Sequence, residues 1–392
     1  MKFFKLIFIV SPVIFTGAIA VGYFYFFKEN SASISNIFNA EKTIKANKHL
    51  TISPQKAVYA TVWTARAKGI NNLIKIADET EINSVIIDVK DNGVYLDDYI
   101  KNLVGELHKK NIYAIARVIV FQDKSQIQKH PDWYFKKEDG AIWKDRRGWH
   151  WLNPANKETW AYNAAIAKQA IDAGFDEINF DYIRFPAFAK NEDVDFPMPP
   201  AGADNIDFAR NGNVDFSYAP KNKIINEFAE YLTSQLRNYD PDIKLSADLF
   251  AFNMLKNDDL GIGQNFKELY DYFDYVCPMI YPSHYSPGNF GFANPAEYPY
   301  EIVFKTIESG KGLLRDKIAL SVGTTTPAIV DPVFKKELKK LRPWIQDFNI
   351  GAMYDGDMIR KEKQAIYDSG LTAGWLLWNP RNVYTESALD SI

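Results

Sequence analysis

From Lys56 to the end of the 392-residue chain, strand-like and helix-like segments alternate, and no change in composition divides them into two domains. A strand followed by a helix and then by another strand is the repeating unit of a parallel sheet. Eight strands are expected, at residues 59–65, 84–90, 113–120, 175–186, 244–250, 275–281, 341–348 and 374–378. Eight such units in one run predict an α/β protein in which residues 56–392 form a (β/α)8 TIM barrel.

Helical spacing marks the connections between these strands. Helices are expected at residues 70–79, 99–110, 159–173, 222–238, 266–273 and 358–368. One further segment, residues 317–322 (KIALSV), has the composition of a strand and exceeds the count of eight. It is predicted to be either an extra strand or part of an extended sixth connection.

The first 27 residues differ from the rest of the chain. Two lysines precede residues 6–27, which carry no charge and exceed the roughly 20 residues that a helix needs to cross a bilayer. An uncleaved membrane anchor at residues 1–27 is therefore favoured, with the barrel on the outer side. The alternative is a cleaved signal peptide and a secreted protein, because residues 18–20 (Ala-Ile-Ala) are small enough for a cleavage site. Residues 28–55 are polar and are expected to link membrane and barrel.

Net charge and cysteine content narrow the class of partner and the compartment. A formal net charge of −3 gives no basic surface of the kind that nucleic acid requires, so no nucleic-acid partner is expected. The single cysteine, Cys277, excludes an intramolecular disulfide framework. An exported protein without disulfides fits the cell membrane of a bacterial envelope better than a eukaryotic secreted protein. A monomer is expected.

Charged residues recur on the predicted inner wall of the barrel. Alternation along each strand sends apolar side chains such as Val85, Ile87 and Val89 outward to the helices and leaves the intervening positions inward. The inward charges are Asp88, Lys90, Arg117, Asp181 and Asp248. Because a buried charge is costly unless it is paired or hydrated, five of them at one end of a barrel indicate a functional polar basin.

Five short motifs, spread along the chain, resemble those of an uncharacterised, mostly bacterial family of glycoside hydrolases. They are WKDRRGWHWLNPANKETW, FDEINFDYIRFP, YPSHY, RPWIQDF and GWLLWNP, and the resemblance extends over roughly residues 56–384. That family has a barrel distantly similar to the α-amylase superfamily. The resemblance implies the fold and the broad class of activity, and it implies little about the substrate.

The amylase-like layout implies three catalytic carboxylates. By position they are Asp181 at the end of the fourth strand, Asp248 at the end of the fifth and Asp347 after the seventh. Two residues depart from that pattern, because Asn179 stands where amylases have an arginine and Asp248 stands where their acid is usually a glutamate. Asp347 shares its parity with Ile345, so it reaches the pocket only if its strand has ended before it.

Glycoside hydrolysis needs two carboxyl groups that flank one bond. Under the amylase analogy, Asp181 attacks the sugar and Asp248 protonates the leaving oxygen. Otherwise Asp181 is itself the acid, with a pKa raised by burial and by a neighbouring carboxylate. Arg117, or Arg184 at the end of the fourth strand, is a candidate for the cation that Asn179 cannot supply.

Side chains suited to sugars are expected at the same end of the barrel. Aromatic faces stack on the C–H surfaces of sugar rings, and histidine or asparagine side chains bond to sugar hydroxyls. The residues expected to bind substrate are Trp151, Tyr281, His284, Trp378 and Asn379, together with Asp88, Lys90, Arg117 and Arg184. Core packing is the other interpretation of each tryptophan.

No metal and no other cofactor is predicted. The five histidines are scattered without the spacing of metal ligands. An insertion at residues 191–220 is rich in aspartate and could bind Ca²⁺, but it lacks the spacing of an EF-hand. A solvated lid over the active site is the simpler interpretation of this insertion.

Together these observations predict a membrane-anchored glycoside hydrolase that cleaves a cell-surface or environmental polysaccharide by paired-carboxylate chemistry. The alternative is a barrel of the same fold that binds envelope glycans without cleaving them. Alanine at Asp181 separates the two hypotheses, because only an enzyme has turnover to lose.

Overall fold

Eight parallel strands form a closed barrel in the computed structural model, which describes residues 49–188, 194 and 220–392. Each strand pairs with the next along the chain, and β8 pairs with β1. The strands are β1 (Gln55–Ala60), β2 (Ser84–Lys90), β3 (Tyr113–Ile119), β4 (Glu177–Asp181), β5 (Lys244–Phe250), β6 (Tyr275–Met279), β7 (Trp344–Gln346) and β8 (Gly374–Trp378). The predicted (β/α)8 barrel is therefore confirmed.

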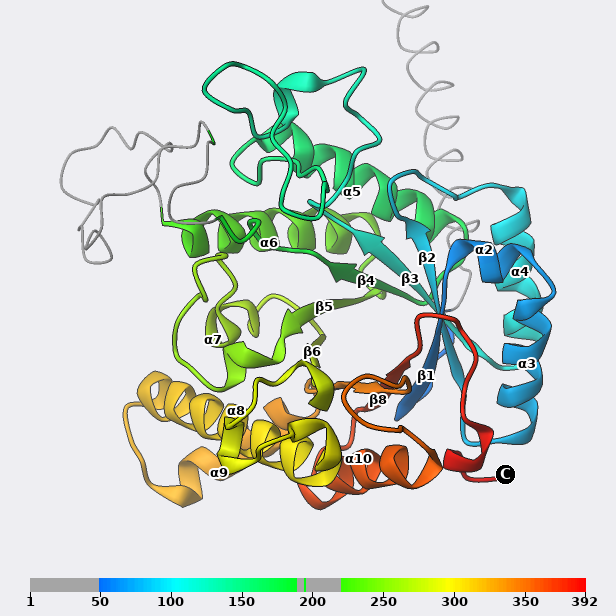
Figure 1. Cartoon of the computed structure of the whole chain (residues 1–392), viewed down its shortest axis with the longest axis vertical. Coiled ribbons are helices and arrows are strands. Elements are labelled where there is room, and N and C mark those ends of the chain that lie inside the picture. Colours follow the sequence, from blue (N-terminus) through cyan, green and yellow to red (C-terminus); the bar gives the residue numbers. More distant parts are fainter. Residues whose placement is uncertain (1–48, 189–193, 195–219) are drawn as a thin grey trace, which may run out of the picture. The chain divides into compact units, whose positions relative to one another are not determined.

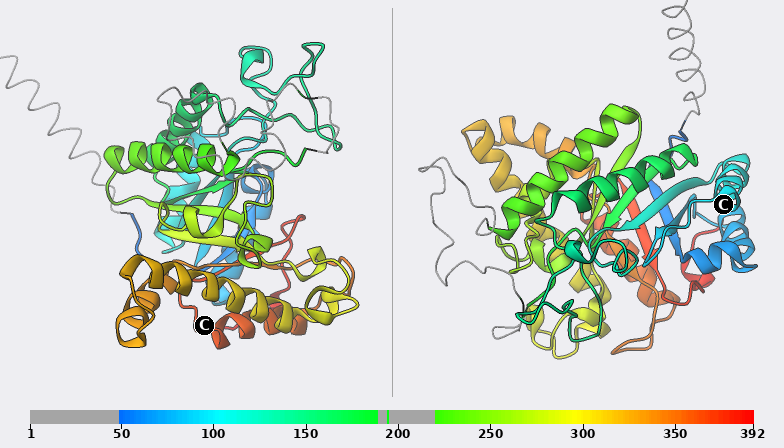
Figure 2. Two further views of the ribbon diagram at one scale, coloured as in Figure 1. Left: turned by 90° about the vertical axis from the view of Figure 1, so that its left-hand side faces the viewer. Right: turned by 90° about the horizontal axis from the view of Figure 1, so that it is seen from above.

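Helices surround the strands on the outside of the barrel (Figures 1 and 2). They are α2 (Val62–Arg66), α3 (Gly69–Glu79), α4 (Asp98–Lys109), α5 (Lys157–Asp172), α6 (Lys221–Tyr239), α7 (Phe266–Leu269), α8 (Pro299–Val322), α9 (Pro327–Leu338) and α10 (Gly356–Asp368). Aspartates start two of them: Asp97 accepts the backbone N–H of Ile100 at 3.3 Å, and Asp355 accepts that of Met358 at 3.1 Å. Such caps satisfy N–H groups that have no partner within the helix.

Apolar side chains cover both faces of the barrel wall. On the outer face, Val85, Ile87 and Val89 of β2 belong to the core that includes the helices, as the alternation predicts. On the inner face, Ile86 of the same strand packs in a second cluster that contains Trp344. Charges on this inner wall therefore lie in largely apolar surroundings, where each needs a partner.

A buried ion pair crosses the interior between the first residue of β4 and the residue two before β7. The Arg342 guanidinium donates to Glu177 through both terminal nitrogens, one of them at 3.2 Å, and neither side chain is exposed. Ser246 adds a hydrogen bond to Glu177 at 2.5 Å. Burial by itself would lower the pKa of Arg342, but the charge of Glu177 raises it overall. This pair lies inside the barrel at the start of β4, where each terminal nitrogen of Arg342 donates to the carboxylate.

Residues 317–322 are the last part of α8, so their interpretation as a strand is wrong. The segment lies in the sixth connection, which was the other predicted possibility. Ile318 continues the buried stripe of Leu314 four residues earlier, a spacing that places both on one face of a helix. Gly323, with φ of 69°, ends the helix in the left-handed conformation that glycine adopts without strain.

Several predicted strands are shifted or shortened. The fourth was expected at residues 175–186, but β4 covers only Glu177–Asp181, and the sixth was expected at 275–281, but β6 ends at Met279. The first strand was expected at residues 59–65, but β1 ends at Ala60 because Thr61 caps α2, accepting the backbone N–H of Thr64 at 3.1 Å. The seventh strand was expected at 341–348, but β7 covers only Trp344–Gln346. Asp347 therefore lies just beyond its strand.

Three predicted features lie wholly or largely outside the described residues. They are the anchor at residues 1–27, the linker at 28–55 as far as residue 48, and the insertion at 191–220 apart from residues 194 and 220. In the part of the chain that the structure does describe, no helix combines the length and the apolar character that crossing a membrane requires.

Candidate active site

Arg117 of β3 brings three carboxylates together on the inner wall of the barrel. Its Nη1 lies 2.7 Å from Asp88 Oδ1, its Nη2 donates to Asp181 Oδ2, and its Nε lies 3.7 Å from Asp248 Oδ2. The exposed fraction of the Arg117 side chain is 12%, and those of Asp88, Asp181 and Asp248 are 2%, 7% and 1%. Four of the five charges that were expected to point inward thus meet in one group.

One guanidinium faces three carboxyl groups here, so protons are held more tightly than usual. Burial raises the pKa of Asp88. Burial and the negative charge of Asp181 raise the pKa of Asp248 to about 8. Burial alone would lower the pKa of Arg117, yet the charges of Asp88 and Asp181 raise it well above its usual value. The group therefore contains a permanent cation and at least one carboxyl that is protonated at neutral pH.

Asp181 is the last residue of β4, and the backbone changes direction directly after it. Tyr182 has φ of 56°, a left-handed conformation that is unusual for an aromatic residue. Its backbone N–H donates to Asp181 Oδ1 at 2.6 Å. Each oxygen of the Asp181 carboxylate thus has one donor, the backbone N–H of Tyr182 or the Arg117 guanidinium. Backbone strain such as that at Tyr182 is concentrated at functional sites.

The two oxygens of Asp248 have different surroundings. Oδ1 accepts the side-chain N–H of Asn179 at 2.9 Å and the indole N–H of Trp344 at 2.7 Å. Oδ2 lies 3.7 Å from Arg117 Nε, beyond hydrogen-bond distance. Because Oδ1 already accepts two donors, the proton of the acid form belongs on Oδ2, the oxygen on the side of Arg117.

Of the two arginines that were candidates for a cationic partner of Asp181, Arg117 is the one that is paired with it. Asn179, which stands where the amylase-like layout has an arginine, donates to Ser246 at 3.0 Å as well as to Asp248. Arg184, the other candidate, is not in an ion pair with Asp181. Its guanidinium lies 4.5 Å from the ring centre of Trp151 and donates to the carbonyl of Phe185 at 3.0 Å.

Sequence reasoning missed two residues of this site. Tyr59 of β1 donates its hydroxyl to Asp88 Oδ2, and Trp344 of β7 donates to Asp248. Their rings meet edge to face at 6.4 Å. Each is an aromatic residue at an inward position, and that parity was the only sign of them in the sequence.

Lys90 does not join the group around Arg117, which corrects its predicted place in the basin. The pairing of β2 with β3 shifts between Asp88 and Lys90, so the two side chains are no longer in equivalent positions. The Lys90 ammonium lies 2.8 Å from Asp123 and donates to the carbonyl of Val120 at 3.0 Å. Lys90 is completely buried and braces the ends of β2 and β3.

Asp347 and Asn379 organise the loop that follows β8. Asp347 accepts the backbone N–H and the hydroxyl of Thr385 at 2.8 and 2.9 Å. Asn379 donates to the Asp347 carbonyl and accepts the N–H of Arg381 at 2.9 Å. Among the contacts of the described residues, none joins Asp347 to Asp181 or Asp248, and the geometry gives it a structural part.

Aromatic residues from three strand ends form a cluster beside the carboxylates. Tyr281 lies 5.5 Å from Trp378, 5.8 Å from Phe348 and 5.3 Å from His284, measured between ring centres. Burial and the charges of Asp248 and Asp181 raise the pKa of Tyr281 well above its usual value, so its hydroxyl lies near both. Trp378 is half-buried and His284 is exposed, and their surfaces are available to a flat ligand.

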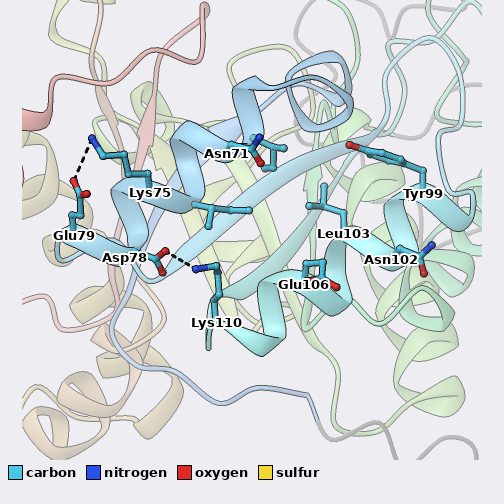
Figure 3. Close-up of a pocket in the computed structure, with 11 residues that line it drawn as sticks. Asn71, Lys75, Asp78, Glu79, Tyr99, Asn102, Leu103, Glu106 and Lys110 are labelled. Atoms are coloured by element: carbon cyan, nitrogen blue, oxygen red, sulfur yellow. Dashed lines mark hydrogen bonds and ion pairs between the residues drawn. The ribbon is translucent and has the colours of Figure 1, made fainter.

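Other features of the described surface do not add to this site. A groove of about 550 Å³ lies between α3 and α4 on the outside of the barrel, and the ion pairs Asp78–Lys110 and Lys75–Glu79 border it (Figure 3). It is remote from Arg117 and contains no comparable group of buried charges. Across the described residues, no three His, Cys, Asp or Glu side chains are arranged to hold a metal ion.

Comparison with known proteins gives one family and several distant structures. The family described as "Putative glycosyl hydrolase domain" matches residues 94–384. No curated protein matches the chain.

Three solved structures represent the range of structural likeness. A hypothetical protein from Ruminiclostridium thermocellum ATCC 27405 is 29% identical, with a TM-score of 0.39, over 52% of this chain and 98% of that one. An α-galactosidase from Thermus thermophilus is 11% identical, with a TM-score of 0.46, over 87% of this chain and 62% of that one. An α-amylase from Geobacillus thermoleovorans is 10% identical, with a TM-score of 0.44, over 84% and 72%.

Proposed function

The chain belongs to the family described as "Putative glycosyl hydrolase domain", and from this premise we propose that it hydrolyses glycosidic bonds with Asp181 and Asp248 as its catalytic pair. One observation carries the proposal. Asp248, with a pKa raised to about 8, lies in the same buried group as Asp181, whose carboxylate is paired with Arg117. Two carboxyl groups of opposite protonation state are what glycoside hydrolysis requires.

Asp248 acts as the general acid. At neutral pH it holds a proton on Oδ2, and it transfers this proton to the glycosidic oxygen as the bond to the anomeric carbon breaks. Asn179 and Trp344 hold Oδ1 and so fix the direction of the carboxyl group. The carboxylate that remains is stabilised by those two donors and by the Arg117 charge.

Asp181 is the second carboxylate. Its pairing with Arg117 gives the negative form a cationic partner, so it is available to attack the anomeric carbon or to take a proton from the attacking water. Arg117 holds Asp181 by one nitrogen and Asp88 by another. These two contacts fix the position of Asp181 relative to Asp248, the proposed acid. The cluster of Tyr281, Phe348 and Trp378 offers aromatic faces to the sugar rings.

We also propose that residues 1–27 anchor the chain in the cell membrane and that the barrel acts on glycans outside the cytoplasm. The uncharged run at residues 6–27 supports this proposal. Cell fractionation combined with protease treatment of intact cells tests it. A barrel that is protected in intact cells and digested only after lysis contradicts it.

Reducing-end release from a panel of polysaccharides tests the hydrolytic function. The wild-type protein is expected to release reducing ends from at least one glycan, and Asp181→Asn is expected to lose this activity while it retains binding. A wild-type protein that binds a glycan of the panel and cleaves none would establish the alternative, a carbohydrate-binding barrel without turnover.

A further inference from the structure

Four cationic residues lie on the β3–α5 loop or directly after β4, and we call these residues, Lys124, Lys144, Arg147 and Arg184, the basic rim. The first three are exposed, and the charges of Lys144 and Lys124 act on His150 of the same loop. The whole chain has a net charge of −3, so this local excess of positive charge does not follow from its composition. These cations lie on the loops that follow the strands of Arg117 and Asp181, where they can act on a substrate.

Arg184 lies among three aromatic rings directly after β4. Its guanidinium lies 4.5 Å from the ring centre of Trp151, 5.0 Å from that of Phe250 and 5.2 Å from that of Tyr182. One nitrogen donates to the Phe185 carbonyl at 3.0 Å. The three rings hold the guanidinium in place, and the hydrogen bond that it makes within the described residues goes to this carbonyl rather than to a carboxylate.

A tight turn places Arg147 next to the same tryptophan. Asp145 Oδ1 accepts the backbone N–H groups of Arg147 and Trp149, both at 2.9 Å, and Oδ2 accepts the indole N–H of Trp151 at 3.0 Å. Gly148, with φ of 81°, allows the chain to reverse. Because Asp145 uses both oxygens to build this turn, the turn is attached to Trp151 and through it to Arg184.

The charge of Arg147 acts on side chains from two different strand ends. Burial is the largest cause that lowers the pKa of His284, which follows β6, and the charge of Arg147 is the second. The Arg147 charge also opposes the charge of Arg184, which follows β4. The Arg147 charge is therefore within electrostatic range of side chains that follow both β4 and β6.

The rim has no anionic partner of its own in the described part of the chain. Within the described residues none of the four forms an ion pair with a carboxylate, although the charges of Asp181 and Asp145 oppose the lowering of the Arg184 pKa by burial. Buried cations elsewhere are paired directly, as in Lys90–Asp123 at 2.8 Å. Unpaired like charges repel one another, and an anionic ligand would relieve that repulsion.

We propose that the basic rim binds an acidic substituent of the substrate, a carboxylate, sulfate or phosphate group on the glycan, and thereby selects anionic over neutral polysaccharides. Arginine suits this part because its planar fork matches the oxygens of all three groups. The inference rests on the proposed glycoside hydrolase function and names the substrate class of that same site.

Binding to matched pairs of oligosaccharides tests the inference. The full chain carrying Asp181→Asn is titrated by calorimetry with oligogalacturonate and its methyl ester, with sulfated and desulfated dextran oligosaccharides, and with phosphorylated and dephosphorylated mannan oligosaccharides. At least one anionic member is expected to bind about tenfold or more tightly than its neutral partner, with an affinity that falls as salt rises. The pair that shows the difference identifies the anion.

Charge variants locate the effect. Adding Arg147→Gln is expected to weaken binding of the anionic member about tenfold and to leave its neutral partner unchanged. Lys101→Gln, which removes the same charge from the exposed surface of α4, is the control and is expected to change neither. Equal affinities within every pair overturn the inference, as does a loss that Lys101→Gln reproduces. Reducing-end release from neutral glycans alone would retain the proposed function and remove the inference, whereas binding without any release would remove the function.

Discussion

Replacing Trp344 with phenylalanine removes one donor from the proposed acid and keeps most of the aromatic ring. The Trp344 indole N–H donates to Asp248 Oδ1 at 2.7 Å, and Asn179 remains as the second donor at 2.9 Å. A donor to a carboxyl oxygen favours the ionised form, so its loss raises the pKa of Asp248 further above about 8. A hydrogen bond contributes about 1.5–3 kcal/mol to an ionised group and about 1 kcal/mol to a neutral one. A difference of about 1.4 kcal/mol corresponds to about one pH unit.

The assay is the pH dependence of kcat/KM on a glycan that the panel identifies. The alkaline limb reports loss of the Asp248 proton in the free enzyme, and in Trp344→Phe it is expected to move upward by about one unit. Trp375→Phe is the matched control, because it removes an indole N–H that donates to the Tyr367 hydroxyl at 3.1 Å on the outer side of the barrel.

Both variants are expected to lose a similar amount of stability, measured as Tm, and only Trp344→Phe is expected to shift the pH profile. If the alkaline limb of Trp344→Phe stays in place or moves downward while the protein remains folded, Asp248 is not the acid that the limb reports. A shift of equal size in Trp375→Phe would refute the argument in another way, because that residue has no contact with the site.

Further predictions concern the pH dependence, Asp347 and the buried ion pair of Glu177 with Arg342. Because Asp248 must be protonated to act as the acid, wild-type kcat/KM is expected to fall above about pH 8, and a profile that stays flat to about pH 10 would contradict this. The folded state holds the Asp248 proton to a higher pH than the unfolded chain does, so the stability due to this proton is lost as pH rises from about 4 to about 8. Asp248→Asn is therefore expected to raise Tm at about pH 9. An unchanged or lower Tm would count against the raised pKa. Asp347→Asn weakens the hydrogen bonds that Thr385 donates, so it is expected to lower the free energy of unfolding by about 1–3 kcal/mol and to change kcat/KM less than about tenfold. A loss of kcat/KM of about a thousandfold at unchanged Tm would make Asp347 catalytic. Glu177→Gln is expected to cost about 3–5 kcal/mol in urea unfolding because Arg342 remains buried without its partner, Glu177→Gln/Arg342→Met should recover part of this, and a neutral single variant would disprove the account of the pair.

Alternation along the strands was sufficient to predict the fold and the four charged residues of the site. The inward positions of Asp88, Arg117, Asp181 and Asp248 follow from local sequence, because neighbouring residues of a strand face opposite sides. The same rule failed for Lys90, where a shift in pairing between β2 and β3 depends on the partner strand and leaves no mark in the sequence of either.

Contacts between distant strands could not be predicted in the same way. The bond from Trp344 to Asp248 joins residues 96 positions apart, and it depends on how the barrel closes. At residues 317–322 the difficulty was local, because a strand was considered where the chain forms the end of a helix. A segment of one lysine and five apolar or small residues fits a strand or a helix equally well, and only the preceding turns of α8 decide between them.

The assignment of Asp248 as acid and Asp181 as the second carboxylate is tested most directly with two substrates of the same sugar. One is the natural glycan, whose leaving oxygen needs a proton, and the other is the dinitrophenyl glycoside, whose leaving group does not. Asp248→Asn is expected to lose at least about a hundredfold in kcat/KM on the glycan and to stay within about tenfold of wild type on the dinitrophenyl glycoside, whereas Asp181→Asn is expected to lose both activities. An equal loss on both substrates in Asp248→Asn, or a retained activity in Asp181→Asn, would contradict the assignment.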